Sequence, residues 1–291
     1  MLERPSLDLI APILTGRSAR QWYADGAPFW RQGRRRKPAK SSQQARKERR
    51  KLVKVLRRHG KGNDCALRLA DILESCSKEH RCLSGACSVC ARAFQRWFVS
   101  AASSVVIPKK HWHVLSVVWR EHRFAEGKLD ANTMFERLRR HLQVALKATK
   151  IRQAIGGFDI SMNEHENGKF VPHWRPHAWI LVATKNPRRL RKHLKERFLA
   201  SKRVRRPLRI VRYDGSPKAL AYALKTDFSR RVSLPRKRIG DSIKTRRNTR
   251  NRPLRAPQKV ELALALDQAG LADRVFQFGK ISILNDDSGD S

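Results

Sequence analysis

Residues 170–184 read FVPHWRPHAWILVAT, a polar, histidine-containing start followed by an apolar run typical of a β-strand. Successive side chains of a strand point to opposite faces, so His177 and Trp179 share one face. An earlier apolar run, GGFDIS at 156–161, carries Asp159 and predicts a second strand. A histidine and a carboxylate on neighbouring strands can hold a metal ion at fixed geometry. We therefore expect Asp159 and His177 to share one exposed face of a sheet.

The charge of the chain points to a polyanionic partner. The 291 residues include 65 Lys+Arg against 25 Asp+Glu, a formal net charge of +40. An ordinary enzyme acting on neutral metabolites does not need such an excess, whereas a nucleic-acid binder gains from releasing counterions from phosphates. A ribosome-associated or merely basic surface protein is the alternative.

No stretch approaches the ~20 apolar residues of a membrane span, and the N-terminus lacks signal-peptide features, so we expect a cytoplasmic protein without a membrane partner.

Composition divides the chain into four segments. Residues 1–62 form a basic arm, partly disordered, whose end from Ser41 to about His59 is helical in composition. Residues 63–100 hold all five cysteines. Residues 101–228 carry the strand and helix patterns of a folded domain, and 229–291 hold a basic, aperiodic stretch, a helix and an acidic tail.

Hydrophobic periodicity predicts the elements of the folded part. The expected strands cover 111–119, 155–161, 176–184 and 207–213. The expected helices cover 132–150, 187–200, 217–228 and 259–277. This order predicts an α+β fold, an antiparallel sheet with helices mainly on one face, preceded by a cysteine-rich zinc knuckle and the basic arm.

The cysteines favour a structural zinc site. Cys82, Cys87 and Cys90 lie close together in the sequence, and the two residues between Cys87 and Cys90 suit one side of a tetrahedral Zn(II) site. Either Cys65 or Cys76 completes a set of four, with His80 as a further candidate. Reduced, buried thiols are the alternative, and no His/Asp pattern marks any cysteine as catalytic.

Several motifs together resemble the replication initiators of bacterial rolling-circle plasmids, in the HUH endonuclease superfamily. CLSGACSVCARAFQRW at 82–97 resembles their cysteine-rich segment, and HVLSVVW at 113–119 their first motif. The stretch from 156 to 184 resembles the second motif, in which an acidic strand precedes His-Pro-His-x-His. ALAYALK at 219–225 resembles the third, in which a helix presents a nucleophilic tyrosine. The order and approximate spacing agree over about 65–228.

The resemblance implies a metal-dependent DNA-nicking endonuclease that starts rolling-circle replication. Tyr222 is then the nucleophile, which leaves a 5′-phosphotyrosine and a free 3′-OH, and Lys225 is its electrostatic partner. Asp159 and His177 bind Mg(II) or Mn(II), with His173 as a candidate third ligand. The implied partners are single-stranded or hairpin DNA at an origin, a host helicase and a polymerase. Tyr213 is the competing tyrosine, on a strand before a turn.

The sequence departs from the family pattern at the second motif. Arg175 stands at the first histidine of His-Pro-His-x-His, and Trp179 at the last, where an indole cannot supply a lone pair to a cation. Asp159 replaces a glutamate. Glu164, His165 or Glu166 could assist the metal site. A transposase or relaxase of a mobile element, or a non-catalytic DNA-binding descendant that lost its metal site through Trp179, are the alternatives.

Overall fold

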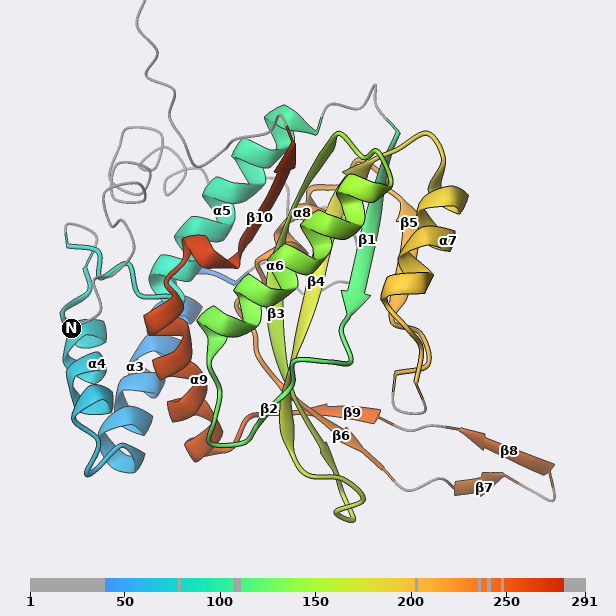
Figure 1. The fold of residues 1–291 in the computed structure, drawn as a ribbon. Helices are drawn as coiled ribbons and strands as arrows, with labels where there is room; N and C mark the ends of the chain where they lie inside the picture. The colour runs from blue at the N-terminus through green and yellow to red at the C-terminus, as the bar shows by residue number, and fades with distance from the viewer. Residues whose placement is uncertain are drawn as a thin grey trace, which may run out of the picture.

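The structure is a computed structural model that describes residues 40–77, 80–106, 111–201, 204–234, 237–239, 242–246 and 249–279. These residues form an α+β fold around an eight-stranded mixed sheet, flanked by helices on both sides (Figure 1). The first 39 residues of the predicted basic arm and the acidic tail lie outside the described residues.

Four antiparallel strands make the centre of the sheet. They lie in the order β5 (Leu208–Arg212), β1 (Trp112–Val118), β4 (His173–Ala183) and β3 (Gln153–His165). All four occur where the sequence predicts strands, although β3 and β4 are longer than expected. Their register pairs Asp159 on β3 directly with His177 on β4.

The free edge of β3 is shared by two strands from the C-terminal part of the chain. β10 (Val275–Gly279) pairs with the first half of β3, antiparallel, and β6 (Arg230–Ser233) pairs with its last residues, parallel. β9 (Thr249–Arg252) continues the sheet beyond β6, and β2 (Phe124–Ala125) pairs with β4. The parallel β3–β6 pair corrects our expectation of a purely antiparallel sheet.

Helices cover both faces of the sheet, and not mainly one as we expected. α6 (Ala131–Ala148) and α7 (Pro187–Arg197) pack in one hydrophobic cluster, with Phe158 and Ile180 of the sheet. α5 (Ser88–Val105) and α8 (Pro217–Ala223) belong to a second cluster, with Ile155 and Leu181. The reason lies in the strands: AWILVA at 178–183 is continuously apolar, which is typical of a strand buried on both faces.

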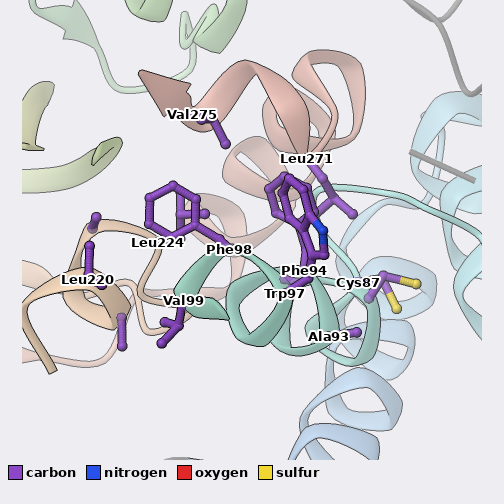
Figure 2. Packing of buried hydrophobic residues seen from close by; sticks show 14 of the residues in the cluster. Cys87, Ala93, Phe94, Trp97, Phe98, Val99, Leu220, Leu224, Leu271 and Val275 are labelled. Carbon is purple, nitrogen blue, oxygen red and sulfur yellow. The ribbon is translucent and has the colours of Figure 1, made fainter. Parts of the chain in front are cut away.

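The second cluster extends from the sheet into the cysteine-rich segment. Figure 2 shows Phe98 of α5 beside Leu224, at the end of α8, and Phe94 and Trp97 of the same helix pointing toward Leu271. Cys87 lies in the same cluster at the beginning of α5. The cysteine-rich segment and the sheet therefore share one continuous core.

Three further helices complete this side of the molecule. α3 (Ser42–His59) begins at an N-cap, Ser41, whose side chain accepts a hydrogen bond from the Gln44 backbone N–H. α4 (Asp64–Ser75) packs against α3, and α9 (Ala256–Ala269) contacts both hydrophobic clusters. None of the helices in the described part of the chain combines the length and apolar character that a bilayer crossing requires.

Residues 229–279 differ most from the expected pattern. The stretch that we expected to be an aperiodic loop contains β6 and β9, together with a separate hairpin of β7 (Lys237–Ile239) and β8 (Ser242–Arg246). This hairpin projects away from the sheet at the lower right of Figure 1. The helix expected at 259–277 ends at Ala269, and 275–279 form β10. The α8 helix also ends early, at Ala223, so Lys225 follows it in a turn.

Candidate functional site

A row of polar side chains crosses the sheet on the face that carries α8, beyond the end of that helix. Alternate residues of β3 and β4 supply it, because only every second side chain of a strand points to this face. We call this row the polar strip; its members, in cross-strand pairs, are Asp159 with His177, Ser161 with Arg175, and Asn163 with His173. All except His177 are buried, and His177 is partly exposed.

The Asp159 carboxylate forms an ion pair with Lys225. The Lys225 Nζ lies 2.8 Å from Oδ2 of Asp159, whose side chain is 8% exposed. The other carboxylate oxygen, Oδ1, is buried and accepts no hydrogen bond from any described residue. The neighbouring His177 lies within the usual ~5 Å Cβ separation of a direct cross-strand pair. Asp159, His177 and Lys225, predicted from two different motifs, therefore converge.

A glycine allows α8 to approach the sheet closely enough for this ion pair. A Cβ atom at Gly157 would lie 2.6 Å from the Ala223 carbonyl oxygen and 2.6 Å from Leu224 Cδ2. Buried Arg274 adds a second restraint, because its Nη2 donates to the Lys225 carbonyl at 2.8 Å and its Nε to the Phe158 carbonyl at 3.3 Å. The backbone of Lys225 is thus fixed against β3.

The electrostatics of the ion pair favour the charged lysine. Burial lowers the pKa of Lys225, but the attraction and hydrogen bond of Asp159 outweigh burial, so the pKa is raised. Lys225 Nζ also lies 5.7 Å from the centroid of the Tyr222 ring. A cation at this distance interacts favourably with the ring face.

His177 is held in its neutral form. Burial is the main cause that lowers its pKa to about 4, and the positive charges of Arg231, Lys225 and Arg175 add to it, against the attraction of Asp159. Its Nε2 lies 3.1 Å from the Ser161 hydroxyl. A neutral imidazole keeps a lone pair, which hydrogen bonding or metal binding requires.

Trp179 holds α8 rather than a metal ion. Its indole Nε1 donates to the Ala219 carbonyl at 2.8 Å, and its ring packs on the Tyr222 ring at a centroid distance of 4.5 Å. Tyr222 is nevertheless 49% exposed. Trp179 therefore orients Tyr222 on the sheet.

Tyr213, the competing tyrosine, lies in a less suitable environment. It follows β5 and packs against the core, and its backbone N–H donates to Trp112 O at 3.0 Å. Burial, with a contribution from Asp214, raises the pKa of Tyr213 to about 12. A phenol with a raised pKa is harder to ionise, which makes Tyr213 a poor candidate nucleophile.

His173 does not lie where a third ligand would have to be. It is paired with Asn163, four residues along β4 from His177, a separation of roughly 13 Å along the strand. Its Nε2 lies 2.7 Å from Arg175 Nη2, and its Nδ1 lies 2.9 Å from the Val171 carbonyl oxygen. The structure therefore does not bring His173 together with Asp159 and His177.

The three residues considered as assistants also point elsewhere. Glu164 forms ion pairs with Arg230 and Arg255, and Glu166 lies 3.2 Å from Arg252. The His165 Nδ1 accepts a hydrogen bond from the Asn167 backbone at 3.0 Å. Apart from four cysteines, no group of three or more His, Cys, Asp or Glu side chains in the described ranges is arranged to hold a metal ion.

Those four cysteines form a second candidate site. The Sγ atoms of Cys76, Cys82, Cys87 and Cys90 all lie within 4.8 Å of one another. Cys65 is exposed on α4, where its Sγ accepts a hydrogen bond from Arg68 at 3.4 Å. The cluster therefore contains Cys76, the alternative that the sequence left open, in place of Cys65.

The geometry of the cysteine cluster suits a tetrahedral metal. Tetrahedral Zn(II) with Zn–S bonds of about 2.3 Å requires S···S separations of about 3.8 Å. The Cys76–Cys90, Cys82–Cys90 and Cys76–Cys87 pairs are 3.6, 3.7 and 3.7 Å apart. Hydrogen bonds from Cys82 above all lower the pKa of Cys76, whereas the interaction with Cys76 above all raises the pKa of Cys82 and of Cys90. The thiols therefore share their protons within one cluster. These four residues could bind a metal such as zinc.

Sequence reasoning missed several members of the site. Ser161 and Asn163 follow Asp159 at intervals of two, a spacing that places them on the same face once the strand is assigned. Arg231 lies beside Asn163 in the β3–β6 register, but its strand carries no recognisable pattern. Buried Arg274 gives no local signal, because its partners are backbone carbonyls far away in the sequence.

Comparison with known proteins gives no match: no protein-family model, no curated protein and no solved structure corresponds to this chain.

Proposed function

We propose that the protein binds DNA and nicks one strand through Tyr222, as the rolling-circle initiators that its motifs resemble do. The single observation that carries the proposal is the convergence of Asp159, His177, Lys225 and Tyr222 on one face of the sheet. His177 and Tyr222, which come from the two motifs, are 45 positions apart in the sequence. A transposase or relaxase of a mobile element would use the same chemistry.

The proposed reaction is a transesterification. The Tyr222 oxygen attacks the phosphorus of a DNA phosphodiester and forms a new O–P bond, while the bond from phosphorus to the 3′ oxygen breaks. The phenol proton passes to solvent, the leaving oxygen takes up a proton as the free 3′-OH, and the 5′ end remains on the protein as a phosphotyrosine. Lys225, beside the Tyr222 ring, stabilises the phenolate that forms during the attack.

Asp159 and His177 would hold the divalent ion that the resemblance implies. The fit rests on the buried Oδ1 of Asp159, which has no hydrogen-bond partner among the described residues, and on the neutral imidazole of His177. Mg(II) is often bound by one or two protein ligands together with water and substrate phosphate. Such an ion, when bound, polarises the scissile phosphate.

A non-catalytic DNA-binding protein is the second candidate, and two observations favour it. Trp179 occupies a ligand position of the motif, where its indole donates a hydrogen bond to the Ala219 carbonyl and packs on the Tyr222 ring. Lys225 already neutralises Asp159, so a cation must compete with an ammonium group for the carboxylate. Both candidates require DNA binding, and they differ only in the covalent step.

We further propose that Cys76, Cys82, Cys87 and Cys90 hold a structural Zn(II) ion. Four thiolates fill the coordination sphere and leave no open position for catalysis. The cluster joins the end of α4 to the beginning of α5, which packs against α8. Zinc would therefore stabilise the helix on which the Tyr222 segment rests.

Formation of a covalent protein–DNA adduct tests the nicking proposal. The full chain is incubated with 3′-labelled, random-sequence single-stranded DNA in Mn(II) or Mg(II), because the label then stays on the strand that carries the phosphotyrosine. We expect a labelled band that resists SDS for the wild type and for Tyr213→Phe, and none for Tyr222→Phe. DNA binding without an adduct under either metal would establish the non-catalytic alternative instead.

A further inference from the structure

A pocket of about 180 Å³ opens at the far end of the polar strip from Tyr222. The strip contributes Asn163 and Arg175 to its lining, and the paired strand β6 contributes Arg231 and Ser233. The segment that precedes β5 closes the pocket with Arg205 and Arg206. Residues from β3, β4, β6 and the segment before β5 thus line one cavity on the face that carries the candidate site.

The lining of this pocket is strongly positive. It contains four arginines and no aspartate or glutamate. Within the described ranges, no ion pair joins Arg205, Arg206 or Arg231 to an acidic side chain. The positive charges of Arg231 and Arg175 both help to lower the pKa of His177, so these two arginines lie near the candidate catalytic residues. Positive charges that lie this close together repel one another, so an anionic ligand would stabilise this arrangement.

One arginine of the pocket is built into the fold. Arg175 is 8% exposed and lies 2.7 Å from His173, which in turn is fixed to the Val171 carbonyl. Arg205, Arg206 and Arg231 are exposed and able to move toward a ligand. A guanidinium presents paired N–H donors that match the oxygens of a phosphate, and it stays charged at any physiological pH.

We propose that this pocket binds a backbone phosphate of the same DNA strand whose scissile phosphate faces Tyr222. The inference rests on the proposed function for the identity of the strand. Asn163 lies four residues along β3 from Asp159, so the two phosphates are roughly 13 Å apart along the strip. This separation spans roughly four nucleotides at the ~3.4 Å rise of a stacked strand, and fewer in an extended one.

The salt dependence of DNA binding tests this subsite. Each phosphate neutralised on a single strand contributes about 0.7 to the slope of log affinity against log salt. We expect Arg205→Ala with Arg206→Ala to reduce the magnitude of the slope for a single strand of about 16 nucleotides by about 0.7, the contribution of the one phosphate that the pocket binds. The matched control removes the same charge from α6 on the opposite face of the sheet, with Arg140→Ala and Lys147→Ala, and should leave the slope nearly unchanged.

The outcomes separate the subsite from general charge. An unchanged slope in the pocket variant, or equal losses in pocket and control variants, would overturn the proposal. A second experiment measures whether inorganic phosphate protects the protein against thermal unfolding. If the pocket variant loses this protection but keeps the salt slope of DNA binding, the pocket binds a free anion, and the proposal is overturned. Thermal unfolding of both variants, measured in parallel, shows whether the fold is kept.

The result is independent of whether the protein nicks DNA. If the wild type forms the Tyr222 adduct but the pocket variant keeps its salt slope, only the subsite fails. If the slope falls but no adduct forms, the subsite holds on a non-catalytic protein. A neutral methylphosphonate moved one position at a time along a bound strand should weaken binding most at a single position, and that loss should disappear in the pocket variant.

Discussion

At the scale of single residues, the ion pair between Asp159 and Lys225 governs the geometry of the candidate site. Lys225 is 25% exposed and Asp159 8%, so neither charge is well hydrated. Removal of one partner from such a pair leaves the other charge buried and uncompensated, which costs more than the pair contributes. The pair therefore holds the turn after α8 against β3 and with it the Tyr222 segment.

Lys225→Met should destabilise the protein by roughly 3 kcal/mol, because the Asp159 carboxylate then lacks its cation. Adding Asp159→Asn in the same chain should recover a large part of this loss, since an amide is cheaper to bury than a carboxylate. Urea unfolding of the wild type, both single variants and the double variant measures the coupling. Strict additivity of the two single effects would show that the pair does not interact in solution.

His177 should make the stability of the fold depend on pH. Its pKa is lowered to about 4 from 6.5, so the unfolded chain binds a proton more readily than the folded one. The contribution is complete above about pH 6.5 and is lost as the pH falls toward 4, by at most about 3 kcal/mol. His177→Gln should flatten the profile of unfolding free energy between these values. If the unfolding free energy of His177→Gln depended on pH as steeply as that of the wild type, the His177 imidazole would not be desolvated.

At the scale of elements, the beginning of α5 connects the cysteine cluster to the candidate nicking site. Cys87 is the N-cap of this helix and Cys90 lies in its first turn. Gln95 of α5 donates to the Ala221 carbonyl of α8 at 2.8 Å. Phe98 of α5 packs in the same buried cluster as Leu224 (Figure 2). A change at the cysteine cluster can thus reach the Tyr222 segment through a single helix.

Cys76→Ser should lower the midpoint of thermal unfolding by several degrees, and removal of zinc by a chelator should do the same to the wild type. Cys65→Ser is the matched control, since Cys65 is exposed and outside the cluster. Metal analysis should find one zinc per chain in the wild type and in Cys65→Ser. A normal zinc content in Cys76→Ser would assign the fourth ligand elsewhere.

The regular elements could be predicted because their sequence patterns agree with their environment. Met134, Leu138, Leu142 and Leu146 recur at helical spacing, and all four are fully buried on α6. The runs around Asp159 and His177 form paired strands whose two residues share one face, as expected. The local hydrophobic pattern was sufficient to predict an element wherever its apolar face packs against the core.

The rest depended on contacts that a sequence does not display. β6 and β9 are rich in arginine and lack alternation, and they are strands because β3 offers a free edge. Cys76 and not Cys65 joins the cluster because Cys76 caps the C-terminal end of α4, whereas Cys65 lies in its first turn. The role of Trp179 is likewise tertiary, since its hydrogen-bond partner lies forty residues away.

At the scale of the whole molecule, positive charge is distributed over both faces of the sheet. The polar strip and its arginine pocket lie on the face that carries α8. A broader groove of about 650 Å³ lies along α7, which packs on the other face. Its basic lining residues are Arg188, Arg191, Lys192, Lys195 and Arg212. A single DNA strand bound at the polar strip can therefore contact only part of the positive charge of the chain, which totals +40, whereas longer or duplex DNA can contact more of it.

The affinity for DNA should consequently depend on salt more steeply than the pocket alone requires. If the protein neutralises six to ten phosphates of a single strand, the slope of log affinity against log salt is roughly −4 to −7. Fluorescence anisotropy at a series of salt concentrations measures it, first with a short single strand and then with a duplex of the same length. We expect a steeper slope for the duplex, because each of its phosphates releases more counterion and both faces can engage. Equal and shallow slopes would place the binding in a few local contacts and leave most of the positive charge without a role in DNA binding.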